Sequence, residues 1–172
     1  MDKKIILILG ILLIMCLGIG GKMYMNKEKD REESLEIQKD LANYVYSNYV
    51  LYTKDEEKAN KIKEAYNKGN GSLTEEEYLK KMKEVREYVD IEKIKFTGYS
   101  ITPMNTVDIH FIINDAYEEE VSLDTISAET NKLMYTISKH SGNGPYYIEE
   151  KKEKTDKIMP DSNISYYVGE VK

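Results

Sequence analysis

The sequence predicts an α+β protein: an N-terminal transmembrane helix, then two or three helices packed on one face of an antiparallel sheet of about four to six strands. Three observations predict it. Residues 5–21 form an uncharged apolar run. Apolar residues then recur at helical spacing as far as residue 89, and after Asp90 their period changes to two. Helices followed by a run of strands are typical of an α+β fold and not of an alternating α/β fold.

The N-terminal segment, residues 1–22, has the pattern of a signal anchor. Lys3 and Lys4 precede the run IILILGILLIMCLGIGG, and Lys22 ends it. At a rise of 1.5 Å per residue this run spans about 25 Å, close to the thickness of a bilayer core. We expect a retained single-pass anchor. Cleavage after Gly20 and lipidation at Cys16 remain open as alternatives.

The orientation of the anchor follows from what lies on either side of it. A count of positive charges alone favours the opposite orientation, because four bases follow the run closely: Lys22, Lys27, Lys29 and Arg31. A very short head and a long acidic C-terminal part instead favour the N-terminus inside. We therefore expect a cell-membrane protein with a charged juxtamembrane stalk over residues 23–33. A single extracytoplasmic domain is expected over residues 34–172.

Composition excludes some classes of partner. The chain has 25 Lys and Arg against 31 Asp and Glu, a net charge of −6, and its only arginines are Arg31 and Arg86. Nucleic-acid binding depends on clustered Lys and Arg, so we expect no nucleic acid as a partner. The only cysteine, Cys16, lies in the apolar run, and the expected domain therefore has no disulfide and no thiol chemistry.

Three helices are predicted before the strands. The first covers residues 35–52 and the second covers residues 55–66. The third begins at a capping box formed by Thr74 and Glu77. Its buried stripe is expected to run through four apolar residues: Tyr78, Met82, Val85 and Val89.

The strands show a clear alternation. Residues 94–101 alternate on either side of Gly98, which indicates a bulge or bend. Residues 107–113 form the best strand, with Asp108 and His110 opposite its apolar face. Asn114 and Asp115 form a turn. Shorter strands are expected at residues 121–125, 133–137, 146–148 and 164–168.

Residues 66–77, YNKGNGSLTEEE, resemble a calcium-binding EF-hand loop. Gly71 matches the turn glycine and Glu77 the bidentate ligand. However, Tyr66 and Lys68 occupy the first and third ligand positions, where oxygen donors are needed. A glycine-rich turn followed by a capping box explains every residue, so we predict no calcium site.

No catalytic pattern is present. Neither His110 nor His140 has partners at the sequence spacing of a zinc site or a Ser-His-Asp triad. Nucleotide-binding loops and the nucleophile elbow are absent from the sequence. The acidic runs at 55–57, 75–77 and 118–120 fit helix N-termini and solvated faces. We predict that the chain is not an enzyme and has no catalytic residue, metal site or small-molecule cofactor.

Residues 91–115, IEKIKFTGYSITPMNTVDIHFIIND, resemble small membrane-anchored or lipoprotein-like domains of unknown function from low-GC Gram-positive bacteria. Thr102-Pro103-Met104 and Ile113-Asn114-Asp115 match their motifs. Asn105 and Thr106 depart from the pattern, because those families prefer glycines there. The resemblance implies a Gram-positive cell surface and a cystatin-like or similar sheet. It implies no activity.

The sequence favours an extracytoplasmic protein-binding domain. Membrane-tethered immunity proteins, which neutralise secreted toxins, share this layout, so an immunity or inhibitor role is the sharpest hypothesis. An envelope protein with a structural or accessory role is the alternative, and an enzyme or a calcium sensor is least favoured. We expect a basic protein partner on the sheet face that carries Asp108 and His110, together with Glu119 if the next strand has the expected register.

Overall fold

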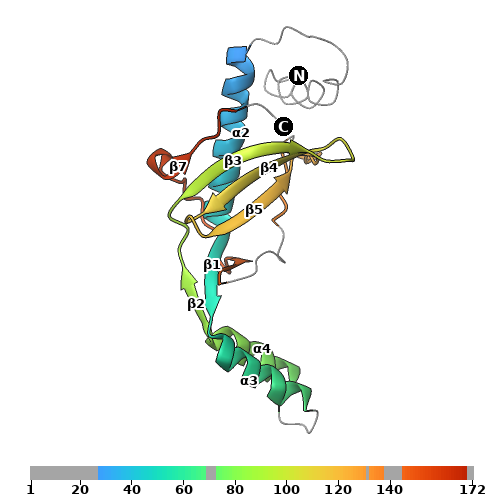
Figure 1. The fold of residues 1–172 in the computed structure, drawn as a ribbon, viewed down its shortest axis with the longest axis vertical. Coiled ribbons are helices and arrows are strands. Elements are labelled where there is room, and N and C mark those ends of the chain that lie inside the picture. Colours follow the sequence, from blue (N-terminus) through green and yellow to red (C-terminus); the bar gives the residue numbers. More distant parts are fainter. Residues whose placement is uncertain (1–26, 69–72, 131, 138–144, 170–172) are drawn as a thin grey trace.

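The computed structural model describes residues 27–68, 73–130, 132–137 and 145–169 (Figure 1). The predicted anchor, its alternative processing sites and His140 lie outside these residues. Among the described helices, none is both long enough and apolar enough to cross a bilayer. The predicted α+β class is confirmed, with three described helices and two sheets in place of one.

The first described helix, α2, spans Lys27–Asn48. Gln38, Leu41, Ala42 and Val45 are its buried residues, and their spacing of three and four places them on one face. The helix begins earlier than predicted, because residues 27–33, expected as a stalk, form its first turns. It also ends earlier: the last four residues of the predicted helix belong to a strand.

That strand, β1 (Tyr49–Lys54), is the centre of a three-stranded antiparallel sheet. It pairs with β2 (Arg86–Val89) on one side and β6 (Tyr147–Glu150) on the other. We predicted Val89 as part of the buried stripe of the third helix, and that prediction is wrong because Val89 lies in β2. Tyr49 and Leu51 are buried alternately, so a short period-two pattern was concealed within the helical spacing.

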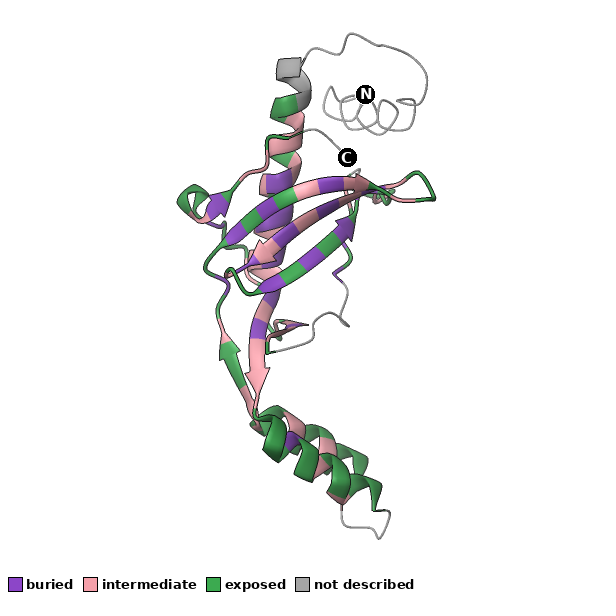
Figure 2. Ribbon diagram, viewed as in Figure 1, coloured by how far each residue is buried: buried purple, intermediate pink, exposed green. Residues whose placement is uncertain are grey.

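Helices α3 (Glu56–Asn67) and α4 (Glu75–Glu84) form a hairpin between β1 and β2. The predicted capping box at α4 is confirmed, with Thr74 and Glu77 bonded reciprocally. Tyr66 and Tyr78 stack with their ring centroids 4.5 Å apart. The hairpin extends away from the rest of the molecule and is largely exposed (Figures 1 and 2). The prediction that these helices cover the sheet is therefore wrong.

The second sheet has the strand order β5-β4-β3-β7. It contains β3 (Ile94–Ile101), β4 (Val107–Ile113), β5 (Tyr117–Ser122) and β7 (Ile164–Ser165). Strand β7 pairs in parallel with β3 and directly follows the 3-10 helix η1 (Asp161–Asn163). The predicted irregularity in β3 is confirmed, because the register shifts between Phe96 and Gly98. The strand predicted over 133–137 is reduced to one bridge, Ile126 to Leu133.

The main core lies between α2 and this four-stranded sheet. Figure 1 shows α2 crossing behind β3, β4 and β5. The predicted inward face of β4 is confirmed, since all four apolar residues are buried in the same cluster as Leu41 and Val45: Val107, Ile109, Phe111 and Ile113. No residue of the α3–α4 hairpin belongs to this cluster among the described residues. One helix therefore covers one face of the sheet.

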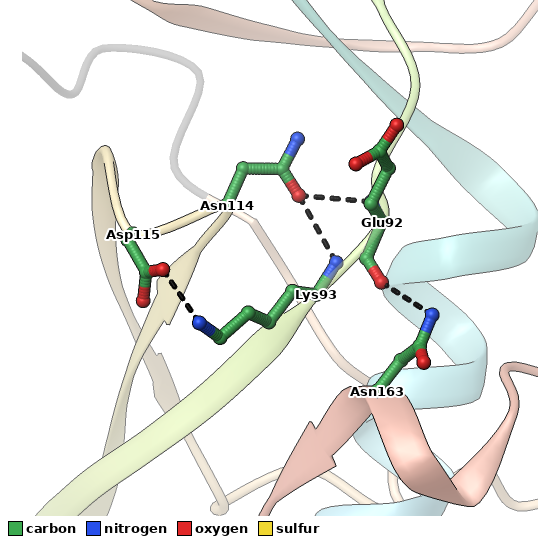
Figure 3. A network of polar contacts seen from close by, with 5 residues as sticks. All are labelled: Glu92, Lys93, Asn114, Asp115 and Asn163. Atoms are coloured by element: carbon green, nitrogen blue, oxygen red, sulfur yellow. Dashed lines mark hydrogen bonds and ion pairs between the residues drawn. The ribbon is translucent and has the colours of Figure 1, made fainter.

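One end of the sheet is held by the side chain of Asn114 (Figure 3). Its Oδ1 accepts hydrogen bonds from the backbone N–H groups of Glu92 (2.8 Å) and Lys93 (3.0 Å). Lys93 Nζ in turn lies 2.6 Å from Asp115 Oδ2, and Asn163 Nδ2 donates to the carbonyl of Glu92. These contacts tie the segment before β3 to the β4–β5 turn and to η1.

Candidate functional site

The face of the four-stranded sheet opposite α2, here called the open face, carries polar side chains on every long strand. The burial pattern of β4 alternates along its whole length, and β5 alternates between buried and exposed residues. Figure 2 shows the same alternation along the strands, and no described helix covers this face. The open face consists of these residues: Lys95, Thr97, Ser100, Asp108, His110, Ile112, Glu118, Glu120 and Ser122.

Asp108 and His110 lie on this face, two residues apart on the central strand β4. Asp108 Oδ1 accepts a hydrogen bond of 2.5 Å from the hydroxyl of Ser122 on β5. His110 Nε2 lies 2.7 Å from the hydroxyl of Ser100 on β3. Both side chains are half-buried and hydrogen-bonded, so the sheet holds them in fixed positions.

Glu119 does not lie on the open face, and the register expected for it is wrong. It pairs with Phe111, whose side chain is buried, and only 6% of Glu119 is exposed. Tyr117 donates its hydroxyl to the Glu119 carboxylate at 3.2 Å on the core side of the sheet. Adjacent residues of a strand point to opposite faces, so the carboxylates on the open face belong to Glu118 and Glu120.

The sequence contained a signal for this register. Tyr117, Val121 and Leu123 are apolar and lie an even number of residues from Glu119, which places Glu119 on their face. Because three glutamates follow one another, the run alone does not show which of them faces the core. Ser100 was missed for a different reason, because its nearness to His110 depends on the register of β3 and β4, in which Gly98 pairs with His110 and Ser100 with Asp108.

Ser100, His110 and Glu120 form a row across three neighbouring strands. His110 Nδ1 lies 3.5 Å from Glu120 Oε2, so the row has the residue order of a serine-hydrolase triad. A hydrolase needs its nucleophile inside the substrate cleft. The shallow depression of about 540 Å³ beside His110 is lined by Thr97, Ile112 and the residues 110–111 and 118–120, but not by Ser100.

The electrostatics of the open face are acidic. It carries three carboxylates, those of Asp108, Glu118 and Glu120, against a single lysine, Lys95. Glu120 is 66% exposed at its side chain, while Asp108 is half-buried. Such a face offers several acceptor oxygens at fixed spacing, which suits Lys and Arg side chains of a partner.

At its C-terminal end, the EF-hand-like segment caps helix α4 through Thr74 and Glu77. The Glu77 carboxylate accepts a 2.9 Å hydrogen bond from the backbone N–H of Thr74. This contact and the Thr74 hydroxyl lower the pKa of Glu77. Asn70 and Gly71 lie outside the described residues. Within the described ranges, no group of three or more potential metal ligands comes together.

A second polar surface lies on the three-stranded sheet. The guanidinium of Arg86 lies over the ring of Tyr52, 4.4 Å from its centroid, and pairs with Glu149. The Tyr88 hydroxyl donates to the same carboxylate at 2.7 Å. Its charged groups are thus already paired with one another, so this surface offers a partner less net charge than the open face does.

Comparison with known proteins adds no relative to this description. No protein-family model, curated protein or solved structure matches the chain.

Proposed function

We propose that this chain is a membrane-anchored extracytoplasmic protein-binding domain that takes a basic protein partner on the open face. The observation that carries the proposal is the excess of carboxylates on a sheet face that no described helix covers. The sharpest version is an immunity or inhibitor protein that neutralises a secreted basic toxin.

Physical reasoning supports a protein partner of this charge. The open face and the net charge of −6 act in the same direction, so a basic protein is attracted before contact. On contact, Lys or Arg groups would reach Asp108 and Glu118, whose oxygens accept charge-assisted hydrogen bonds. Asp108 is held by Ser122 and His110 by Ser100, so little side-chain freedom is lost on binding.

The anchor belongs to the same proposal. The apolar run of residues 5–21 is the basis for expecting membrane attachment. Helix α2 begins at Lys27, only a few residues after that run, and continues into the core of the domain. So short a separation along the chain would keep the domain close to the membrane surface, where a toxin that acts on the membrane could be intercepted.

The test compares two full-length variants with the same net charge. Glu118→Lys with Glu120→Lys reverses the charge of two exposed residues on the open face, while Glu76→Lys with Glu153→Lys makes the same change in net charge at exposed sites elsewhere. Each immobilised chain is used to capture a partner from the producing cells, beside thermal melts of all three proteins.

We expect the wild type and the Glu76/Glu153 variant to retain the same protein and the open-face variant to lose it. All three should melt within a few degrees of one another, because surface substitutions change stability little. If both charge-reversed variants capture that protein equally, the open face is not its binding site.

A further inference from the structure

The connection between β3 and β4 carries an exposed apolar cluster, here called the apolar tip: Ile101, Pro103 and Met104. Met104 is 88% exposed, the largest value among the exposed large hydrophobic residues that the structure describes. Ile101 is 48% exposed and Pro103 is also exposed. Adjacent apolar side chains left in water without cover are typical of interaction sites.

The backbone of this connection is well fixed. The Thr102 N–H donates to the Thr106 carbonyl at 2.9 Å, and the Asn105 N–H donates to the Thr102 carbonyl at 2.8 Å. The hydroxyls of Thr102 and Thr106 lie 2.6 Å apart. Asn105 takes a positive φ of 61°, which asparagine tolerates better than most residues. Pro103 and Met104 are therefore presented by a pre-organised turn, which lowers the entropy lost on binding.

The apolar tip adjoins the end of the open face that carries Ser100 and Asp108. These two residues are paired across β3 and β4 on the open face. The next pair, Ile101 with Val107, lies on the core side, and the turn with Pro103 and Met104 joins its two residues. In Figure 1 the loop joining β3 and β4 extends beyond the end of β5. A protein that covers Asp108 would therefore meet the tip with the adjoining part of its surface.

We infer that Met104 is the apolar anchor of the partner interface and fills a pocket beside the partner's basic surface. This inference rests on the proposed function. The unbranched thioether of Met adapts to irregular pockets. A protein pocket fits better than a lipid surface, because residues 96–115 contain no Lys or Arg to attract anionic lipids, and the nearest charge along β4 is Asp108.

The experiment places the photo-crosslinker p-benzoylphenylalanine at single positions of the full-length chain in the cells that produce it. Position 104 tests the apolar tip and position 120 tests the open face. Position 158 is the control, because Ile158 is also apolar and 71% exposed but lies beside α2, in the segment before η1. Adducts are identified by mass spectrometry, and the protein found at position 120 is purified for affinity measurements.

We expect positions 104 and 120 to yield the same protein and position 158 not to yield it. Met104→Ser should then weaken the affinity for that purified protein about tenfold or more, the range of interface anchor residues, without lowering the melting temperature. Adducts at 104 with lipid or with a different protein would overturn the inference, as would an unchanged affinity. Adducts at 120 without any at 104 would overturn the inference alone. No adduct at either position would contradict the proposed function as well.

Discussion

The side-chain amide of Gln38 pairs with the backbone of Tyr167 in both directions. Gln38 Nε2 donates to the Tyr167 carbonyl at 2.9 Å, and the Tyr167 N–H donates to Gln38 Oε1 at 2.8 Å. The same Nε2 lies 3.0 Å from the hydroxyl of Tyr99 on β3. Gln38 is 0% exposed, so this one side chain joins α2, the sheet and the C-terminal segment inside the protein.

Replacing Gln38 by Ala should destabilise the domain by about 2–3 kcal/mol, because a fully buried side chain would lose its hydrogen bonds to the part-buried backbone of Tyr167 and to the hydroxyl of Tyr99. Urea unfolding of the two proteins measures this difference. Glu36→Ala, at an exposed position of the same helix, should change stability by less than about 0.5 kcal/mol. Equal losses in the two variants would show that the Gln38 contacts contribute nothing specific.

Asn114 combines two roles that substitution can separate. Its φ is 51°, in the left-handed region, and its side chain bonds to the segment before β3. Asn114→Gly removes the hydrogen bonds but keeps a residue that takes a positive φ without strain, whereas Asn114→Ala also loses the tolerance of asparagine for the left-handed region, at an added cost of about 1–2 kcal/mol. The alanine variant should therefore be the less stable of the two in denaturant unfolding. If the glycine variant is as unstable as the alanine variant, the whole loss of stability comes from the lost hydrogen bonds.

The strongly periodic elements were predictable from sequence because a local pattern specifies them. The alternation along β4 and the capping box of Thr74 and Glu77 each depend on neighbouring residues alone. The short strands β1 and β2 were not predictable in this way, because Tyr49 and Leu51 fit both a helical and an alternating pattern. Their strand conformation depends on long-range pairing: β1 pairs with β6, nearly one hundred residues later in the chain, and β2 pairs with β1 across the α3–α4 hairpin.

The candidate site was predictable in part for the same reason. Asp108 and His110 belong to the strand with the clearest alternation, and their face follows from it. Glu119 could not be assigned from its own run of three glutamates, and Ser100 became a neighbour of His110 only through the register in which β3 pairs with β4. The apolar tip needs tertiary information too, because exposure of Met104 cannot be read from a Pro-Met pair.

The buried tyrosines predict a specific response to alkaline pH. Burial is the main cause that raises the pKa of Tyr49, Tyr117 and Tyr135, and nearby Asp40 adds to it at Tyr135. A raised pKa means that the folded state favours the neutral phenol. These groups therefore make their full contribution to the free energy of unfolding below the usual tyrosine pKa of about 10. That contribution is lost as the pH rises above this value through the raised pKa of the folded state.

Absorbance at 295 nm should consequently show a late group of tyrosines, including Tyr49, Tyr117 and Tyr135, that ionises only as the fold is lost. Near-ultraviolet circular dichroism, recorded in parallel, reports the loss of the fold. Tyr135→Phe should reduce the late group. Ionisation of every tyrosine near pH 10 with the circular dichroism unchanged would contradict this assignment.

The anchor prediction concerns where the full-length protein is found. We expect it in the membrane fraction at its complete length, because residues 5–21 are apolar and the signals at Gly20 and Cys16 are poor. Mass determination of the purified protein distinguishes the alternatives. A mature chain starting at Gly21 in the culture medium would contradict the retained anchor, and an acyl chain on Cys16 would replace it with a lipoprotein.

Carboxylate footprinting of the complex tests the open face most directly. A carbodiimide and an amine label exposed carboxylates, and the extent of labelling at each residue is compared with and without the captured partner. We predict that Asp108, Glu118 and Glu120 lose most of their labelling in the complex, while Glu76 on the α3–α4 hairpin and Glu153 are labelled as before. Protection confined to carboxylates of residues 56–84, with the open face labelled equally in both states, would contradict the account.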